Sequence, residues 1–223
     1  MSYDTEIHAH LNNSDKFYNI RQVIRGLGSD ISLALPFFYA FTRCDTVSSF
    51  YGKNKCKAYD VWIKSEQKDD LTVFIQLGEK PTNVTSDQID MLESFVLQLY
   101  GSTYDKLGAT RLDKFNKSTD NDFHSLPPSK EALRQHIYRA SYQAGYLWRQ
   151  SVEELDIPNP EQWGWKADST GDFEPLWLTS KSSVTVKDFI QTCSCKTEKC
   201  NGCKCACANA ECLSMCGCGR GCI

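Results

Sequence analysis

The sequence has no long apolar segment anywhere in its 223 residues. No run approaches the roughly 18 apolar residues that a membrane-spanning helix needs. The N-terminal stretch MSYDTEIHAHLNNSDK is polar and charged, so the apolar centre of a secretion signal is also missing. Because of these two absences, we expect an intracellular, reducing environment and no membrane partner.

Cysteine is scarce over residues 1–192, where only Cys44 and Cys56 occur, which is ordinary usage for a reducing compartment. The chain also lacks a Ser/His/Asp set, a phosphate-binding loop and a dinucleotide-binding fingerprint. An excess of positive charge is absent, since 25 Lys and Arg face 28 Asp and Glu. This balance excludes broad electrostatic capture of nucleic acid, so any such contact must be local.

Residues 193–223 are the exception, because they hold ten of the twelve cysteines and almost no apolar residue. Such a segment cannot build a hydrophobic core, so disulfides or metal must hold it. Disulfides would require a secreted chain, whereas closely spaced thiolates suit tetrahedral zinc. We therefore expect metal, with thiolates shared between ions in one cluster.

The cysteine spacing resembles that of the CXC domain of tesmin-type and related chromatin proteins. In that family nine cysteines hold about three zinc ions and the domain binds DNA. The resemblance implies the same zinc content here, a nuclear location, and DNA or chromatin proteins as partners. It leaves Cys207 as an additional thiol, and Gly202 stands where the family commonly has an aromatic residue. The matching zinc ligands are Cys193, Cys195, Cys200, Cys203, Cys205, Cys212, Cys216, Cys218 and Cys222.

The charge of the tail is only weakly favourable for DNA, with four Lys and Arg against two Glu over residues 193–223. Zinc-bound thiolates add negative charge, so a DNA contact would depend on a few side chains such as Lys204 and Arg220. A purely structural zinc module that contacts proteins is the alternative.

The rest of the chain is predicted to be a mainly α body, because apolar residues recur at helical spacing. The clearest helix covers 87–100, where Thr85 and Gln88 form a capping box. Helices are also expected over 17–27, 30–42 and 130–150, while the composition of 71–77 favours a strand without deciding it. The expected organisation is a flexible terminus at 1–16, a helical region at 17–104, a polar loop at 105–128, a helix with a Trp-rich crossover at 129–192, and the zinc domain at 193–223.

Residues 41–62, FTRCDTVSSFYGKNKCKAYDVW, place a glycine-containing turn between two apolar stretches. Backbone amides in such a turn can bind a phosphate, and nearby lysines would strengthen the contact. Lysines that are merely solvated, with Asp45 as a helix cap, are the simpler interpretation. The candidate nucleic-acid contacts are Gly52, Lys53, Lys55 and Lys57.

This segment resembles the helix–two-turn–helix region of flap-endonuclease-like nucleases of the PIN fold. The resemblance puts Asp45 in the place of a metal-ligating aspartate, and Ser49, Gly52, Ala58 and Asp60 fall on further matching positions. More closely, residues 17–223 resemble the C-terminal part of uncharacterised invertebrate proteins associated with mobile elements. Arg43 and Asn54 stand where that group usually has glycines.

Hydrolysis by two metal ions needs several carboxylates around ions ~4 Å apart, and Asp45 is the single candidate here. We therefore expect a truncated, nuclease-like region without catalysis, that is, a zinc-binding module that contacts nucleic acid. One alternative is a metal-dependent, structure-specific nuclease whose other carboxylates come from a partner chain or an N-terminal extension. The other alternative is a protein–protein scaffold with a structural zinc cluster.

Three minor expectations complete the prediction. The tryptophans of the crossover, Trp163, Trp165 and Trp177, should fix it to the helical body rather than stack on bases. His136 should lie on the polar side of its helix. Cys44 and Cys56 should be buried free thiols.

Overall fold

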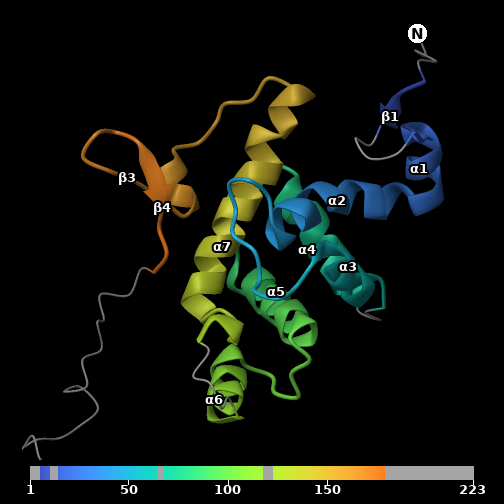
Figure 1. The fold of residues 1–223 in the computed structure, drawn as a ribbon. Helices are drawn as coiled ribbons and strands as arrows, with labels where there is room; N and C mark the ends of the chain where they lie inside the picture. The colour runs from blue at the N-terminus through green and yellow to red at the C-terminus, as the bar shows by residue number, and fades with distance from the viewer. Residues whose placement is uncertain (1–5, 11–14, 65–67, 118–122, 179–223) are drawn as a thin grey trace, which may run out of the picture. The chain divides into compact units, whose positions relative to one another are not determined.

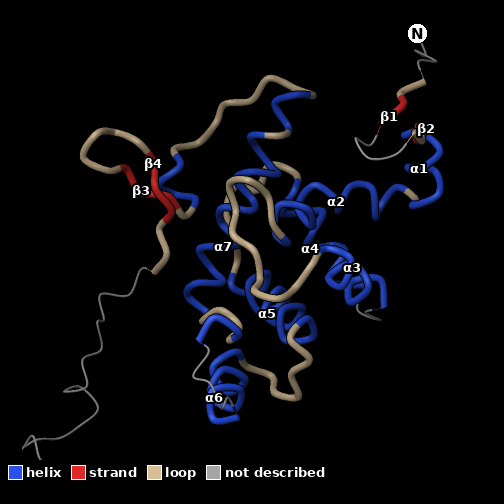
Figure 2. The backbone as a smooth tube through the Cα atoms, in the orientation of Figure 1, coloured by secondary structure: helices blue, strands red, loops and turns tan. Residues whose placement is uncertain are grey.

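The computed structural model describes residues 6–10, 15–64, 68–117 and 123–178 (Figure 1). Over these residues the chain is mainly helical, as predicted, and its strands are short (Figure 2). None of the helices in these ranges is both long and apolar enough to cross a membrane. The predicted zinc ligands between Cys193 and Cys222, together with Lys204 and Arg220, lie outside the described residues.

Two antiparallel strand pairs and seven α-helices make up the described elements. The helices are α1 (Ile20–Leu27), α2 (Ser29–Thr42), α3 (Lys55–Lys64), α4 (Lys68–Gly78), α5 (Ser86–Leu99), α6 (Leu107–Lys117) and α7 (Lys130–Tyr142). Shorter helical turns are η1 (Phe123–Ser125), η2 (Gln143–Leu147), η3 (Arg149–Ser151) and η4 (Pro160–Trp163). The strand pairs are β1 (His8–His10) with β2 (Phe17–Asn19), and β3 (Trp165–Ala167) with β4 (Phe173–Pro175).

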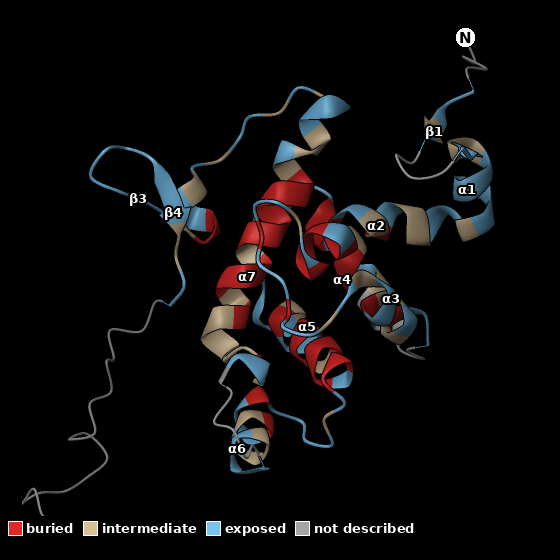
Figure 3. Cartoon of the chain, in the orientation of Figure 1, coloured by how far each residue is buried: buried red, intermediate tan, exposed pale blue. Residues whose placement is uncertain are grey.

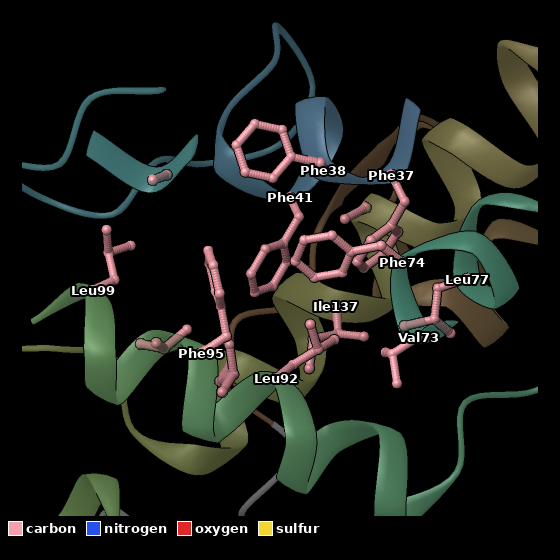
Figure 4. Packing of buried hydrophobic residues seen from close by; sticks show 14 of the residues in the cluster. Phe37, Phe38, Phe41, Val73, Phe74, Leu77, Leu92, Phe95, Leu99 and Ile137 are labelled. Atoms are coloured by element: carbon pink, nitrogen blue, oxygen red, sulfur yellow. The ribbon is translucent and has the colours of Figure 1, made fainter. Parts of the chain in front are cut away.

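The core lies where α2, α4, α5 and α7 meet, and the buried faces of these helices turn toward one another (Figure 3). Aromatic rings fill its centre, as Figure 4 shows. The ring of Phe41 on α2 lies 6.1 Å from that of Phe95 on α5, and Phe74 on α4 lies 5.5 Å from Phe95. All three side chains are fully buried. This cluster fixes the C-terminal end of α2, from which the candidate site begins.

The capping box and helix predicted around 87–100 are confirmed. Thr85 Oγ1 accepts from the Gln88 amide at 3.2 Å, and Gln88 Oε1 accepts from the Thr85 amide at 3.0 Å. The helix predicted over 30–42 also forms, with Pro36 inside it. Segment 71–77, which the sequence left undecided although its composition favours a strand, lies in helix α4. Its buried residues Val73, Phe74 and Leu77 share one helical face, so packing against α2 outweighs strand propensity.

The polar loop predicted at 105–128 is wrong for Leu107–Lys117, which forms α6. Its apolar pattern is weak, since Leu107 is buried while Leu112 and Phe115 stay exposed. The helix begins at a tertiary contact: Glu93 Oε1 on α5 accepts a hydrogen bond from the Leu107 amide at 2.9 Å. A carboxylate at a helix N-terminus stabilises its unpaired amides, and this acceptor is remote in sequence.

Two helix limits also differ from the prediction. Residues 17–19, expected to start a helix, form β2 and pair with His8–His10 inside the segment predicted to be a flexible terminus. The helix expected over 130–150 is α-helical only as far as Tyr142 and then widens into a π-helical turn, η2. Gly145 lies in that turn, where a Cβ atom would be 2.6 Å from Pro81 Cδ, so only glycine allows the close approach.

The crossover after α7 is held by Arg139. Its Nη1 donates hydrogen bonds to the carbonyl oxygens of Gly164 at 3.1 Å and Leu176 at 2.8 Å, and the guanidinium lies 5.1 Å from the centroid of the Trp177 ring. Trp163 is buried against α7. The predicted anchoring role is therefore confirmed for Trp163, whereas Trp177 keeps 59% of its surface exposed.

Candidate nucleic-acid interface

Residues 43–54 connect α2 to α3 and carry the predicted phosphate-binding turn. Two side chains of the connection, Val47 and Phe50, are buried in the core. The Phe50 ring lies 5.2 Å from that of Phe41 and 4.9 Å from that of His136. These contacts fix a segment that has neither helix nor strand, so the turn that follows it has a defined position.

His136 on α7 holds the same connection through its ring nitrogens. The carbonyl oxygen of Phe41 lies 2.7 Å from Nε2 and can only accept, so Nε2 carries the proton. Nδ1 then accepts from the Ser48 hydroxyl at 3.0 Å. Burial lowers the pKa of His136 to about 4, although the bond to Phe41 opposes the shift, and Arg139 lowers it further. The prediction that His136 lies on a polar surface is therefore wrong, because it is a buried, neutral residue.

Lys55 caps the C-terminal end of α2. Its Nζ donates to the carbonyl oxygen of Tyr39 at 2.7 Å, to the carbonyl oxygen of Arg43, and to Thr42 Oγ1 at 3.2 Å. The same ammonium lies 3.5 Å from the centroid of the Tyr39 ring. A cation at this end of a helix is favoured by the helix dipole and by the unpaired carbonyl groups. With its three donors used in this way, Lys55 has a structural role that the sequence did not indicate.

Arg43 ends α2 with a φ of 147°, a backbone conformation that favours glycine. Such a conformation in a residue with a side chain costs on the order of 1–3 kcal/mol. It persists here because Lys55 and the buried Phe50 hold the chain on either side. A glycine at this position would have no such penalty.

The turn itself spans residues 50–53. The amide of Lys53 donates to the carbonyl oxygen of Phe50 at 3.0 Å, and Gly52 has a φ of 66°. A positive φ at the third position of a β-turn requires glycine or a similarly tolerant residue. Asn54 then starts α3, since its Oδ1 accepts from the Lys57 amide at 2.8 Å. The helix cap proposed for Asp45 is therefore provided by Asn54 instead.

A cavity of about 570 Å³ opens at this junction. Arg43, Asp45, Ser49 and Lys53 contribute to its lining. Among the described residues no group of three or more His, Cys, Asp or Glu side chains could hold a metal ion, and Asp45 is the one carboxylate that lines this cavity. The exposed Asp45 carboxylate shares this lining with the cations Arg43, Lys53 and Lys55.

A second cavity, of about 630 Å³, shares Gly52 and Lys53 with the first. Its other walls come from the turn after α5 and from α6, including Tyr104 and Lys114. Tyr100 lies beneath Lys53, whose Nζ is 4.7 Å from the centroid of the tyrosine ring. Segments about sixty residues apart in the sequence thus form one surface.

Lys53 and Lys114 line this cavity, and Lys57 lies close enough to Lys53 for its charge to act there. We call these three residues the lysine cluster. Partial burial lowers the pKa of Lys53, and the charges of Lys57 and Lys114 lower it further. Like charges that repel one another are unfavourable unless an anion lies between them. The cluster is therefore suited to bind phosphate groups.

No family model matches the chain, and no curated protein or solved structure matches it. The resemblances to the CXC domain and to the nuclease segment therefore stay predictions.

The prediction that both free thiols are buried is wrong for Cys56, which is exposed, and Cys44 is only partly buried.

Lys114 is a candidate interface residue that the sequence did not indicate. It lies in the segment predicted to be a loop, so nothing placed it near the glycine turn. The spacing of Leu107, Thr110 and Lys114 fits one helical face and was the available signal. Its position beside Lys53 depends on Glu93, which starts α6.

Proposed function

We propose that this protein is a non-catalytic, zinc-bearing module of the nucleus that contacts nucleic acid at two places. The first contact is the lysine cluster with the Gly52 turn. The second is the cysteine-rich tail, through Lys204 and Arg220. The single observation that carries the proposal is that Lys53 and Lys114 line one cavity, with Lys57 close enough to act on Lys53, in a chain whose net charge is −3.

The lysine cluster supports phosphate binding without sequence readout. Lysine is a flexible point charge that neutralises phosphates but does not distinguish bases. A net acidic chain does not attract nucleic acid over its whole surface, so affinity depends on the few cations gathered at one place. Binding should therefore be weak, tolerant of sequence and sensitive to salt.

The donor set of the tail supports zinc as its cofactor. Tetrahedral sites for about three ions can be completed by nine thiolates when some of them bridge two ions. The ligands would be the cysteines matched to the CXC pattern, with Cys207 left over. Zinc bound there would supply the folding free energy that the tail cannot obtain from apolar burial.

The lysine cluster can be tested by reversing its charge. We expect the triple variant Lys53→Glu, Lys57→Glu, Lys114→Glu to bind every DNA sequence roughly tenfold or more weakly at ~100 mM salt, because up to three phosphate contacts are lost. The slope of log affinity against log salt should fall by about two. Fluorescence anisotropy with labelled duplex and single-stranded oligonucleotides over a salt series measures both quantities.

Lys55→Met is the matched control, because the Lys55 ammonium group donates to the C-terminal end of α2 and Lys55 lines the first cavity but not the second, where Lys53 and Lys114 lie. It should lower the free energy of unfolding by about 1 kcal/mol and leave DNA affinity within about twofold. The variant Lys204→Glu, Arg220→Glu should remove a separable contact. If the triple variant and a chain ending at residue 179 both bind DNA as well as the parent, neither segment is a nucleic-acid site and the protein-scaffold alternative replaces the proposal.

We expect no cleavage of flap or single-stranded DNA by the isolated chain with Mg²⁺ or Mn²⁺, because two-metal hydrolysis needs several carboxylates around Asp45. Gel electrophoresis of end-labelled substrates after prolonged incubation checks this. Reproducible cleavage that disappears in Asp45→Ala would make the nuclease alternative correct.

A further inference from the structure

The larger of the two cavities combines positive charge with exposed aromatic rings. Lys53, Lys114 and Lys117 face a single carboxylate, Asp113, in its lining. That carboxylate is already paired, since Lys117 Nζ donates to Asp113 Oδ2 at 2.8 Å. The charge of Lys114 also acts on Asp113, so this one carboxylate is shared by two lysines, and the cavity wall keeps a net positive charge from its three lysines.

Two tyrosines with accessible rings line the same cavity from opposite segments. Tyr51 is 56% exposed and stands at the corner of the Gly52 turn, while Tyr104 is 44% exposed and follows α5. Backbone hydrogen bonds define the turns that carry both residues. The Lys53 amide donates to the Phe50 carbonyl oxygen at 3.0 Å, and the Ser102 amide donates to the Leu97 carbonyl oxygen at 2.9 Å.

Hydrogen bonds from the side-chain hydroxyl and from the backbone amide hold Tyr104 in a defined orientation. Its hydroxyl donates to Asp113 Oδ1 at 3.2 Å, and its amide donates to Ser102 Oγ at 3.0 Å. The Ser102 hydroxyl in turn lies 2.6 Å from Thr110 Oγ1 on α6. A ring fixed in this way loses little conformational entropy when a flat ligand stacks on it.

Phosphate-binding lysines that alternate with accessible aromatic rings suit a single strand. Bases in a duplex are stacked on each other and present only their edges, so side-chain rings cannot reach their faces. Unpaired bases stack on aromatic side chains with roughly 1–3 kcal/mol each and with little sequence preference. A volume of about 630 Å³ falls within the roughly 300–1,000 Å³ of small-ligand sites and accommodates a nucleotide-sized group.

From these observations we propose that the cavity between the Gly52 turn and α6 binds a segment of single-stranded nucleic acid, with Lys53 and Lys114 on phosphates and with Tyr51 and Tyr104 stacked on unpaired bases. This inference deepens the proposed function and rests on it. The lysines serve any nucleic acid, whereas the tyrosines add affinity for an unpaired strand alone. The full chain should therefore prefer a single strand to a duplex of the same length.

The test compares tyrosine variants that keep or remove the rings. Labelled oligothymidylate, oligouridylate and a blunt duplex of equal length are titrated with the full chain and followed by fluorescence anisotropy. We expect Tyr51→Leu, Tyr104→Leu to bind oligothymidylate roughly thirtyfold or more weakly and the duplex within about twofold of the parent. The matched variant Tyr51→Phe, Tyr104→Phe keeps both rings and should bind oligothymidylate within about threefold of the parent. Equal losses for oligothymidylate and oligouridylate would support stacking on any single strand, and a loss confined to one would assign the site to DNA or to RNA.

Three results would overturn the inference. One is unchanged single-strand binding by the leucine variant, and another is an equal loss for single strand and duplex, which would mean that the tyrosines only support the fold. The third is an equal loss by the leucine and phenylalanine variants. These outcomes differ from failure of the proposed function, in which the parent binds neither probe or the lysine triple variant binds both as well as the parent. Circular dichroism of each variant establishes that the helices are retained.

Discussion

The chain purified under reducing conditions will contain about three zinc ions per molecule, and a strong chelator will unfold the cysteine-rich tail. Structural zinc sites contribute roughly 10–16 kcal/mol of apparent binding free energy, which a segment without an apolar core cannot replace. The tryptophans all lie between Trp62 and Trp177, so their fluorescence reports on the chain before the cysteine-rich tail. Chelation should therefore release zinc and expose reactive thiols while tryptophan fluorescence stays unchanged.

Elemental analysis gives the zinc content, and a colorimetric zinc indicator with a thiol reagent follows the release. The neighbouring cysteines Cys205 and Cys207 provide a matched pair of variants, because the CXC resemblance makes one a ligand and the other a spare thiol. Cys207→Ser should keep the full zinc content, whereas Cys205→Ser should lose zinc. A content of one ion or none in the parent would contradict the cluster. Oxidised cysteine pairs in freshly isolated protein would favour the disulfide alternative.

The free energy of unfolding will fall as the pH is lowered from 7 toward 4, and His136 will cause a large share of the loss. The folded-state pKa of about 4 lies below the ordinary value of 6.5, so between these values the unfolded chain binds the extra proton. Stability from the neutral imidazole is therefore fully present above pH 6.5 and is lost as the pH falls through 4. The loss should be about 2 kcal/mol between pH 7 and pH 5.

Urea denaturation at several pH values, followed by tryptophan fluorescence, measures this dependence. His136→Gln is the appropriate comparison, since its amide can donate to the Phe41 carbonyl and accept from Ser48 but does not titrate. The difference in unfolding free energy between parent and variant should shrink by about 2 kcal/mol from pH 7 to pH 5. Parallel pH profiles for the two proteins would show that His136 is not the titrating group.

Local signals in the sequence predicted several features correctly. The capping box at Thr85 and Gln88 acts within one helical turn, so its residue types are sufficient to place the start of α5. Gly52 marks a turn because its positive φ is a local requirement. Segment 71–77 is a case where local preference was overridden, because burial of Phe74 and Leu77 against α2 is possible only with helical spacing.

Contacts between segments remote in sequence account for what could not be predicted. The sequence shows that Lys55 lies near the glycine turn. The hydrogen bonds that its ammonium group donates to carbonyl groups at the end of α2 depend on the path of the connection between α2 and α3. The buried state of His136 depends on Ser48 and Phe41, about ninety residues earlier in the chain. No local pattern carries information of this kind.

The sequence by itself determined that the chain is mainly helical, that ten of its cysteines lie in residues 193–223, and that a lysine-bearing glycine turn follows α2. These properties depend on composition, spacing and backbone preference, which act over a few residues. The tertiary structure alone decided which lysines share a surface. It placed the Lys55 ammonium group at the C-terminal end of α2. It also placed Lys114 near Lys53, because α6 begins where the buried carboxylate of Glu93 accepts a hydrogen bond from the amide of Leu107.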